Sequence, residues 1–439
     1  MRRCRRLASV VLVVSAVWPA IARAQPPADT FDAAWKIVRD THFDPKMNGV
    51  DWDAVRTELR PRAVAAATPG ELRAVIREML GRLGQSHFAL LPSSADSPRE
   101  APVDGGADPG FEVRLSGRDL LVTSVEPTGG AAAAGVKPGW VLRTIDGTAM
   151  STVLAAVDQA LPPRLLNVEA WRAAENRLRG PSGSVVRLGF DAAGDQPVVL
   201  SVTRQAETGE PATIGNLPTF HVRLESERRP TPAGRPAGII RFNVWMPAVD
   251  ARFQQAIDEL RDAAGIVLDL RGNPGGLAAM LMGISGHFLE ERKPLGVMKT
   301  RDAQLNFAAN PRLVNARGER VKPFAGPVAI LVDAMSGSAT ECFAGGMQSI
   351  GRARVFGQTS MGQALPALFD RLPNGDLMIH AYGDFVTADG TRLEGRGVVP
   401  DQPVPLDRQA LLAGHDPTLE AALAWIDQGK PGPGGTALR

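Results

Sequence analysis

Cysteine is nearly absent from this chain of 439 residues, which contains only Cys4 and Cys342. Cys4 lies in an N-terminal segment that we expect to be removed, so the mature chain would keep one thiol and form no intramolecular disulfide. Cys342 is best interpreted as a buried structural thiol. An exported protein without disulfides must rely on its core, and 44% apolar residues are enough for about two or three domains.

The sequence also lacks the patterns of several functional classes. No long run of basic residues suggests a nucleic-acid partner. No spacing of His, Cys, Asp or Glu resembles a zinc or calcium site. No glycine loop with a lysine is present to bind a phosphate. We therefore expect neither a metal nor a cofactor.

The N-terminus has the features of a secretory signal peptide. Residues 7–21 are mostly apolar, and residues 22–24 (Ala-Arg-Ala) form a small-x-small cleavage site before Gln25. A basic cluster precedes the apolar stretch: Arg2, Arg3, Arg5 and Arg6. The stretch is too short to span a bilayer comfortably, so we expect no stable membrane anchor. These features predict export to the periplasm or the extracellular space, with 44 basic and 47 acidic residues left in the mature chain.

Three kinds of pattern follow one another along the rest of the chain. Residues 29–91 have apolar side chains at helical spacing. Residues 110–205 read as short strands separated by turns. From residue 238 onward, strands and helices alternate, which predicts an α/β layer with mainly parallel strands and a site at their carboxyl ends.

The most informative segment is residues 332–341 (Val-Asp-Ala-Met-Ser-Gly-Ser-Ala-Thr-Glu). An apolar strand ends here and a helical pattern begins at once. Ser338 would therefore lie at a strand-to-helix corner, beside free N–H groups that can hold an oxyanion. The same letters also form a capping box, in which Ser338 and Glu341 only satisfy the helix end. The segment alone leaves both interpretations open.

A second turn has a related form. Residues 269–276 (Asp-Leu-Arg-Gly-Asn-Pro-Gly-Gly) close a buried strand and open a helix. Their glycines allow N–H groups to point outward, so the turn can supply another oxyanion donor, or simply form a tight turn with an anion nest. Both turns follow strands of one layer, so we expect them to converge at one edge.

Together with residues 394–401 (Glu-Gly-Arg-Gly-Val-Val-Pro-Asp), these motifs resemble the C-terminal-processing (tail-specific) serine peptidases. Residues 131–147 resemble part of a PDZ domain. The resemblance implies an α/β catalytic core with a mainly parallel, ClpP/crotonase-like layer, an N-terminal helical domain and an inserted β-rich PDZ domain. The predicted boundaries are a signal peptide at 1–24, the helical domain at 25–104, the PDZ-like domain at 105–208, a linker at 209–235, the peptidase core at 236–428 and a disordered tail at 429–439.

The best-known branch of this family uses a Ser-Lys dyad, with the lysine 25 residues after the serine. In this chain that position is Gln363, which has no basic lone pair. Residues 84–87 (Gly-Gln-Ser-His) instead resemble the tricorn-core and retinoid-binding-protein-like branch. There a histidine replaces the lysine as the base, so a Ser-Lys mechanism is excluded here.

The second branch implies roles for particular residues. Ser338 would be the nucleophile, His87 the general base and acid, and Glu394 the group that holds the imidazole tautomer. Ser86 would support the site by hydrogen bonding. The N–H groups of Gly276 and Ala339 would form the oxyanion hole. The competing interpretations are a capping or core role for the histidine and an ordinary loop carboxylate for the glutamate.

PDZ domains bind extended peptides, often at their C-termini, by adding a strand to a sheet edge. The loop that would hold the terminal carboxylate is reduced here to residues 109–111, which makes Gly110 and Phe111 candidate substrate contacts. Capture of a free terminus, a structural role and a gating role all remain open for this module.

The leading hypothesis is an exported serine endopeptidase that cuts unfolded or extended polypeptides through an acyl-enzyme on Ser338. With a histidine as base, its activity should rise through roughly pH 6–7. The alternative is a non-catalytic protein on the same fold that binds peptides or apolar ligands. An esterase of the α/β-hydrolase type is a poorer match, because its nucleophile elbow requires glycine where this chain has Thr340. Oligomeric state is left open.

Overall fold

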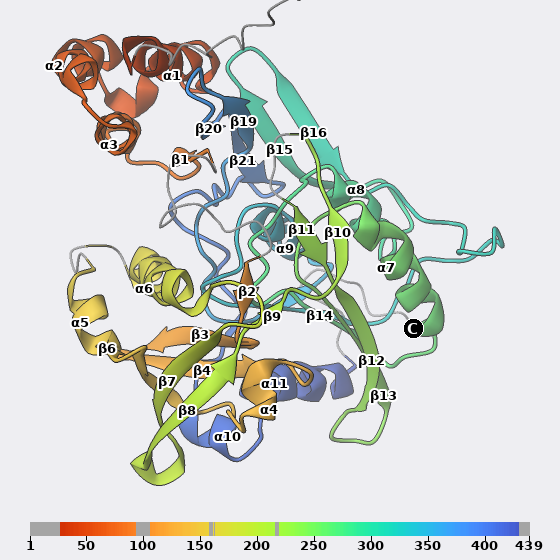
Figure 1. Ribbon diagram of the computed structural model, residues 1–439. Coiled ribbons are helices and arrows are strands. Elements are labelled where there is room, and N and C mark those ends of the chain that lie inside the picture. Colours follow the sequence, from red (N-terminus) through yellow and green to blue (C-terminus); the bar gives the residue numbers. More distant parts are fainter. Residues whose placement is uncertain (1–26, 94–105, 158–160, 162, 216–218, 430–439) are drawn as a thin grey trace, which may run out of the picture.

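The computed structural model describes residues 27–93, 106–157, 161, 163–215 and 219–429. They form a helical part, a β-rich module and an α/β core, coloured from red through yellow to blue in Figure 1. The signal peptide predicted at residues 1–24 lies outside the described residues, as does the predicted tail at 429–439 apart from Gly429. No helix in the described ranges is long and apolar enough to cross a membrane.

The helical part packs around two tryptophans. Its helices are α1 (Pro27–Thr41), α2 (Trp52–Ala65) and α3 (Pro69–Gly81). Trp35 and Trp52 are buried, and each donates its indole N–H to the other's backbone carbonyl. The side chains of Asp51 and Thr68 accept N–H groups from the first turns of α2 and α3, which fixes where these helices begin.

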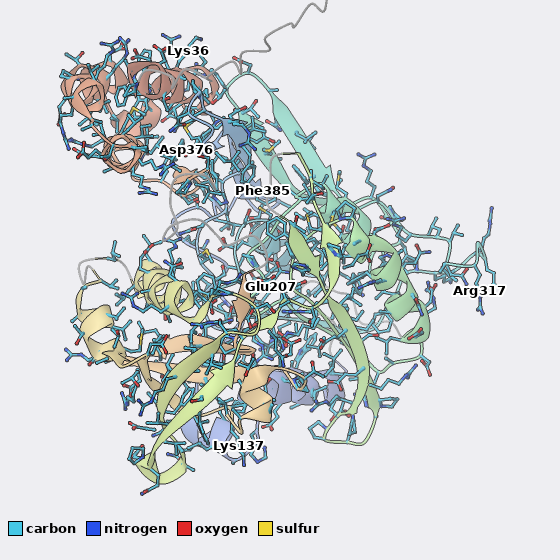
Figure 2. All side chains as sticks on the ribbon, viewed as in Figure 1. Lys36, Lys137, Glu207, Arg317, Asp376 and Phe385 are labelled. Atoms are coloured by element: carbon cyan, nitrogen blue, oxygen red, sulfur yellow. The ribbon has the colours of Figure 1, made fainter. Side chains whose placement is uncertain are left out.

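A three-stranded sheet joins the helical part to the core. Its strands, in spatial order, are β1 (Ala89–Leu91), β20 (Leu377–Ala381) and β19 (Ala367–Arg371). Leu90, Leu372 and Met378 share the apolar core of the helices. Asp376, beside β20, lies below the helices in Figure 2. The loop from α3 to β1, which carries His87, is therefore held against the core.

The β-rich module consists of residues 107–206. Its elements are β2 (Ala107–Asp108), β3 (Phe111–Ser116), β4 (Asp119–Val125), α4 (Gly130–Ala133), β5 (Val141–Ile145), β6 (Thr148–Ala149), α5 (Met150–Ala155), α6 (Pro163–Leu178), β7 (Val185–Asp191), β8 (Pro197–Thr203) and β9 (Gln205–Ala206). The main sheet is antiparallel, in the order β3-β4-β5-β7-β8, so β3 is an edge strand. Helix α6 packs along β3, with Ala170 and Ala174 buried in the core shared with Val113.

The α/β core is built on a six-stranded sheet. Its strands are β12 (Leu224–Pro230), β13 (Pro236–Phe242), β14 (Ile266–Asp269), β17 (Val328–Val332), β18 (Arg354–Gly357) and β22 (Gln402–Pro403), in that spatial order. β12 is antiparallel to β13, and the remaining pairings are parallel. Further elements are β10 (Glu210–Ala212), β11 (Phe220–Val222), α7 (Ala248–Glu259), α8 (Met280–Ser285), β15 (Pro294–Thr300), β16 (Gln304–Ala308), α9 (Ala339–Ser349), β21 (Gly383–Thr387), α10 (Arg408–Leu412) and α11 (Pro417–Asp427).

Both faces of this sheet are covered. Alternate residues of β14 and β17, such as Leu268 and Ile330, pack with side chains of α7, α8 and α9. Their neighbours Val267 and Leu331 pack on the other face, against α11. Burial on both faces explains why these strands are continuously apolar in sequence.

The segment predicted to be a linker, residues 209–235, instead contains strands β10, β11 and β12. β12 pairs with β13 along its whole length and so belongs to the core sheet. It lies at the edge, and six of its seven side chains are exposed. An exposed edge strand carries charged residues and proline that protect it from pairing with other chains, so it reads as a connector in sequence.

Candidate active site

Ser338 lies between β17 and α9 in a strained backbone conformation. Its φ is +53° and its ψ is −121°. Its N–H donates to the carbonyl of Gln363 at 2.9 Å and to the carboxylate of Glu341 at 3.2 Å. A side chain on Gly275 would place its Cβ 2.6 Å from the Cβ of Ser338, so only glycine fits there. The contact with Glu341 is part of a capping box, so both interpretations of this segment share one geometry.

Glu341 fixes the loop opposite the nucleophile. Its side chain is fully buried. Besides the N–H of Ser338, it accepts hydrogen bonds from Ser360 Oγ at 2.5 Å, Gly362 N at 2.7 Å and Gln363 N at 2.9 Å. Burial raises the pKa of Glu341 to about 7, although these donors lower it. Glu341 was predicted from sequence to have only a capping role, because the loop that it anchors lies some twenty residues further along the chain.

Ser86, His87 and Glu394 form a continuous hydrogen-bonded chain. The carboxylate of Glu394 accepts from the backbone N–H of Ser86 at 2.9 Å and from its hydroxyl at 2.8 Å. The hydroxyl is also 2.8 Å from Nδ1 of His87. Glu394 is thus linked to the imidazole by way of the Ser86 hydroxyl.

The chain of contacts fixes the imidazole tautomer. Ser86 has one hydroxyl proton, and the Glu394 carboxylate can only accept, so that proton is donated to the carboxylate. The hydroxyl oxygen must then accept a proton from Nδ1 of His87. Nε2 is consequently the unprotonated nitrogen, with a lone pair able to take a proton.

The loop at Gln363 and Ala364 lies between the nucleophile and this chain of contacts. The carbonyl of Gln363 accepts from Ser338, and the next N–H, that of Ala364, donates to Glu394 at 2.9 Å. Within the described residues, Ser338 and His87 make no hydrogen bond with each other. In catalytic sites without substrate, the hydrogen bond between nucleophile and base is often long or poorly aligned. Like Ser338, His87 has a positive φ, +59°, which is uncommon for residues other than glycine.

Two N–H groups lie beside the nucleophile. The ideal Cβ position of Gly275 is 2.9 Å from the Ala339 nitrogen, which brings the turn of residues 269–276 against the first turn of α9. The N–H groups of Gly276 and Ala339 have no acceptor among the residues described. Ala339 N is an unsatisfied donor at a helix N-terminus, and Gly276 is exposed with φ +135°. These are the two donors expected from sequence.

Asn273 ties the two turns together. Its carbonyl accepts from Gly337 N at 3.0 Å, and its side-chain oxygen accepts from Gly275 N at 3.0 Å and Thr340 Oγ1 at 2.9 Å. Trp245 in turn donates its indole N–H to Thr340. Asn273 is fully buried. The role of Asn273 in joining the two turns was not predicted from sequence. The available signal was a polar residue between glycine and proline in a tight turn.

Cys342 does not take part in this site. It is buried in α9, its Sγ is 4.0 Å from the carbonyl of Ala364, and burial raises its pKa well above the usual value. In the part of the chain that the structure describes, no three His, Cys, Asp or Glu side chains are grouped as metal ligands.

Gly110 and Phe111 lie in the β-rich module, at the start of β3. The N–H of Gly110 donates to the side chain of Asp108 at 2.7 Å. Phe111 is buried against Phe190 with an edge-to-face ring contact. Phe111 is thus a core residue of the module, and it lines a cleft together with Gly110.

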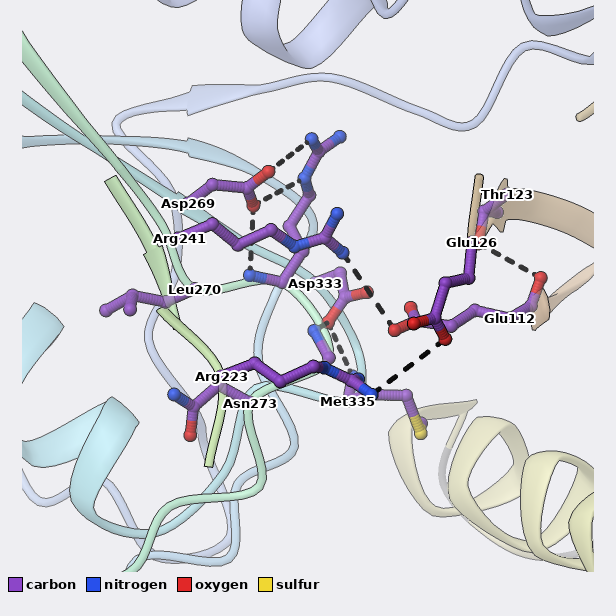
Figure 3. Close-up of polar contacts among 12 residues, drawn as sticks. Glu112, Thr123, Glu126, Arg223, Arg241, Asp269, Leu270, Asn273, Asp333 and Met335 are labelled. Carbon is purple, nitrogen blue, oxygen red and sulfur yellow. Dashed lines mark hydrogen bonds and ion pairs between the residues drawn. The ribbon is translucent and has the colours of Figure 1, made fainter. Parts of the chain in front are cut away.

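That cleft separates the β-rich module from the core, and charged groups cross it (Figure 3). Arg114 of β3 donates to Asp333 at 2.7 Å, five residues before the nucleophile. Arg241 of the core is 3.9 Å from Glu112 of the module. Met335 packs with Val168 of α6. The segment leading to Ser338 therefore contacts both β3 and α6.

Two family models match the chain. Residues 236–404 match peptidase family S41, and residues 24–81 match the tricorn protease C1 domain. The first match covers most of the core, including Gly276, Ser338 and Glu394. The second covers the three helices that precede His87.

Curated relatives match over most of their length. A carboxyl-terminal-processing protease of Synechocystis is 24% identical over 377 residues, covering 84% of this chain and 79% of that protein. A chloroplastic C-terminal processing peptidase of Tetradesmus obliquus is 25% identical over 393 residues, covering 87% and 77%. The solved structure of a photosystem II D1 C-terminal processing protease has a TM-score of 0.58 at 24% identity and covers 91% of this chain and 97% of its own, which indicates a common fold.

Proposed function

The chain belongs to the family of C-terminal-processing serine peptidases, and from that premise we propose that Ser338 is its nucleophile, with His87 as base. The protein is a serine endopeptidase. Ser86 and Glu394 would act on the imidazole, and the N–H groups of Gly276 and Ala339 would receive the oxyanion. The relatives are named as processing proteases, which gives the non-catalytic alternative no support.

The proposed reaction has two halves. Nε2 of His87 takes the proton of the Ser338 hydroxyl while Oγ attacks the peptide carbonyl, and the oxyanion is held by two backbone N–H groups. The imidazolium then gives its proton to the departing amine, leaving an acyl-enzyme. Water activated by the same nitrogen hydrolyses the ester. The carboxylate of Glu394, acting through Ser86, stabilises the imidazolium in both halves.

One observation carries this proposal: the hydrogen-bonded chain from Glu394 through Ser86 to His87. It leaves Nε2 as the basic nitrogen. The same carboxylate holds Ala364, whose neighbour Gln363 holds the nucleophile backbone. A histidine with a purely structural role would not need a chain of hydrogen bonds that orients its ring and ends beside the strained Ser338.

We further propose that the β-rich module is a PDZ domain and that substrates bind as extended or unfolded segments. Its edge strand β3, whose outer side pairs with no other described strand, and the adjacent α6 form the kind of groove in which a peptide adds a strand. The N-terminal sequence supports removal of residues 1–24 and action outside the cytoplasm.

The experiment that tests the base is hydrolysis of a dye-labelled unfolded protein by the chain beginning at Gln25. His87→Ala should reduce kcat/KM by about a thousandfold or more, because no other group at the site can take the serine proton. Ser86→Ala should cost roughly 10- to 100-fold, as expected for loss of a supporting contact. His415→Ala, at an exposed histidine, is the control. Full activity in His87→Ala would overturn the assignment.

The pH profile is a separate prediction. Burial lowers the pKa of His87 to about 4. A general base works when neutral, which for this group means above pH 4. kcat/KM should therefore rise between about pH 3 and 5 and stay level to about pH 8, which replaces the rise through pH 6–7 expected from an ordinary histidine. Circular dichroism at each pH would show whether the fold persists. An acid limb at pH 6–7 would contradict burial of the free imidazole.

A further inference from the structure

The groove of the β-rich module has a distinct end. A cleft of about 250 Å³ runs beside β3, and no strand of the described chain pairs with the outer edge of β3. The cleft is lined by Trp171 and Glu175 of α6, which are one helical turn apart, and by Arg179 just after the end of the helix. Arg114, further along β3, donates to Asp333 of the core. One end of the cleft is formed by Asp108 and Gly110.

The side chain of Asp108 already accepts a hydrogen bond from the backbone N–H that a bound carboxyl terminus would need as a donor. Carboxylate ends of peptides are captured by backbone N–H groups just before such a strand. Here the N–H of Gly110 already donates to Oδ1 of Asp108 at 2.7 Å. The module thus supplies its own carboxylate at this position, and Oδ2 of Asp108 has no donor among the described residues.

The charges around this end also oppose a further anion. Glu126 and Glu175 line the cleft with Asp108. Burial raises the pKa of Asp108 and raises that of Glu175 to about 7, because this end of the cleft solvates negative charge poorly. The neighbouring cations are engaged: Arg179 pairs with Glu207 at 2.6 Å and Glu175 at 3.4 Å, and Arg223 lies 3.9 Å from Glu126.

We propose that this groove binds an internal segment of an extended polypeptide and does not select a free carboxyl terminus. The inference rests on the proposed function of the module as a peptide-binding domain. A terminal carboxylate only accepts hydrogen bonds, whereas an internal peptide group also donates one. The N–H of an internal segment can donate to Oδ2 of Asp108, where a carboxylate would meet a like charge. Substrates would then be selected within the chain, and their polypeptide would continue past Gly110.

Binding to the Ser338→Ala chain decides the question without cleavage. The probes are two dye-labelled copies of one disordered peptide of about 30 residues, one with a free carboxylate and one with a C-terminal amide that mimics an internal peptide group. Fluorescence anisotropy should give the amide an affinity equal to or higher than that of the acid. Asp108→Ala should strengthen binding of the acid by about tenfold and weaken binding of the amide by about three- to tenfold, because it removes the carboxylate that accepts the amide N–H. Asp119→Ala, in the β3–β4 turn, is the matched control.

A wild-type preference of tenfold or more for the acid would overturn the inference, as would failure of both peptides to bind. Cleavage is read separately, with the active chain and a disordered substrate whose C-terminus is free or closed by a folded domain. Similar kcat/KM values for the two substrates support internal selection, and cleavage of the free-ended substrate alone contradicts it. If neither substrate is cleaved, the proposed peptidase function is wrong. The anisotropy result would still decide what the groove binds.

Discussion

Ser338→Ala is expected to reduce hydrolysis of an unfolded protein by a factor of about 10⁴ or more. The substitution removes the atom that would form the acyl-enzyme and, with it, the serine side-chain half of the capping box at the start of α9. The N–H of residue 338 keeps its contacts with Gln363 and Glu341, because both are made by the backbone. Residual activity over water would come from the oxyanion donors alone. Initial rates at several substrate concentrations would measure the loss in kcat/KM.

The matched control for this experiment is Ser349→Ala, at the opposite end of α9. The Ser349 hydroxyl donates only to the carbonyl of Gly346, and it lies outside the site. Its replacement should leave kcat/KM within about twofold of the parent. Thermal unfolding of both variants should match the parent within a few degrees. Comparable activity in Ser338→Ala and Ser349→Ala would show that another group is the nucleophile.

The strand-to-helix corner at Ser338 was predictable from sequence because its signal is local. A buried apolar strand, a Gly/Ser turn and a helix start occur within residues 328–341, and the structure has them in that order. The Gly276 turn was predictable for the same reason. Parallel strands place both turns at one edge of the sheet, so their convergence followed from the fold class.

The histidine and the glutamate depended on resemblance to a family. Ser86 and Glu394 are 308 residues apart in sequence, and they meet only because β1 docks against β20. Periodicity carries no information about such a contact. The sequence also could not show that the glutamate acts through Ser86, since either arrangement uses the same residues.

Other features depend on desolvation, which a sequence does not specify. The low pKa of His87 and the high pKa of Glu341 both arise from burial by elements distant along the chain.

Edge strand β12 was not predicted, because its amino-acid composition reflects its exposure to solvent and not its pairing with β13. The contact of Asp108 with Gly110 spans two residues, yet its meaning depends on the groove that α6 completes.

Asp376→Ala is expected to destabilise the docking of the helical part by about 3–5 kcal/mol. Asp376 accepts from Nε and Nη2 of Arg73 at 2.9 Å each, and the two side chains are 0% and 1% exposed. Burial raises the pKa of Asp376, but the bonds from Arg73 and from Ser93 N hold it below its usual value. Removing the carboxylate would leave a buried guanidinium facing a cavity. Since α3 and β1 flank His87, kcat/KM should fall together with the unfolding temperature.

The exposed ion pair between Glu58 and Arg82 provides the comparison, with side chains 55% and 41% exposed. Glu58→Ala should cost less than about 1 kcal/mol, because solvent screens the pair. In the double variant Arg73→Met with Asp376→Leu, neither charge is buried, so stability should recover most of the loss. Differential scanning calorimetry of the four proteins would separate these cases. Equal unfolding temperatures for Asp376→Ala and Glu58→Ala would mean that the buried pair does not hold the helices that precede His87 to the core.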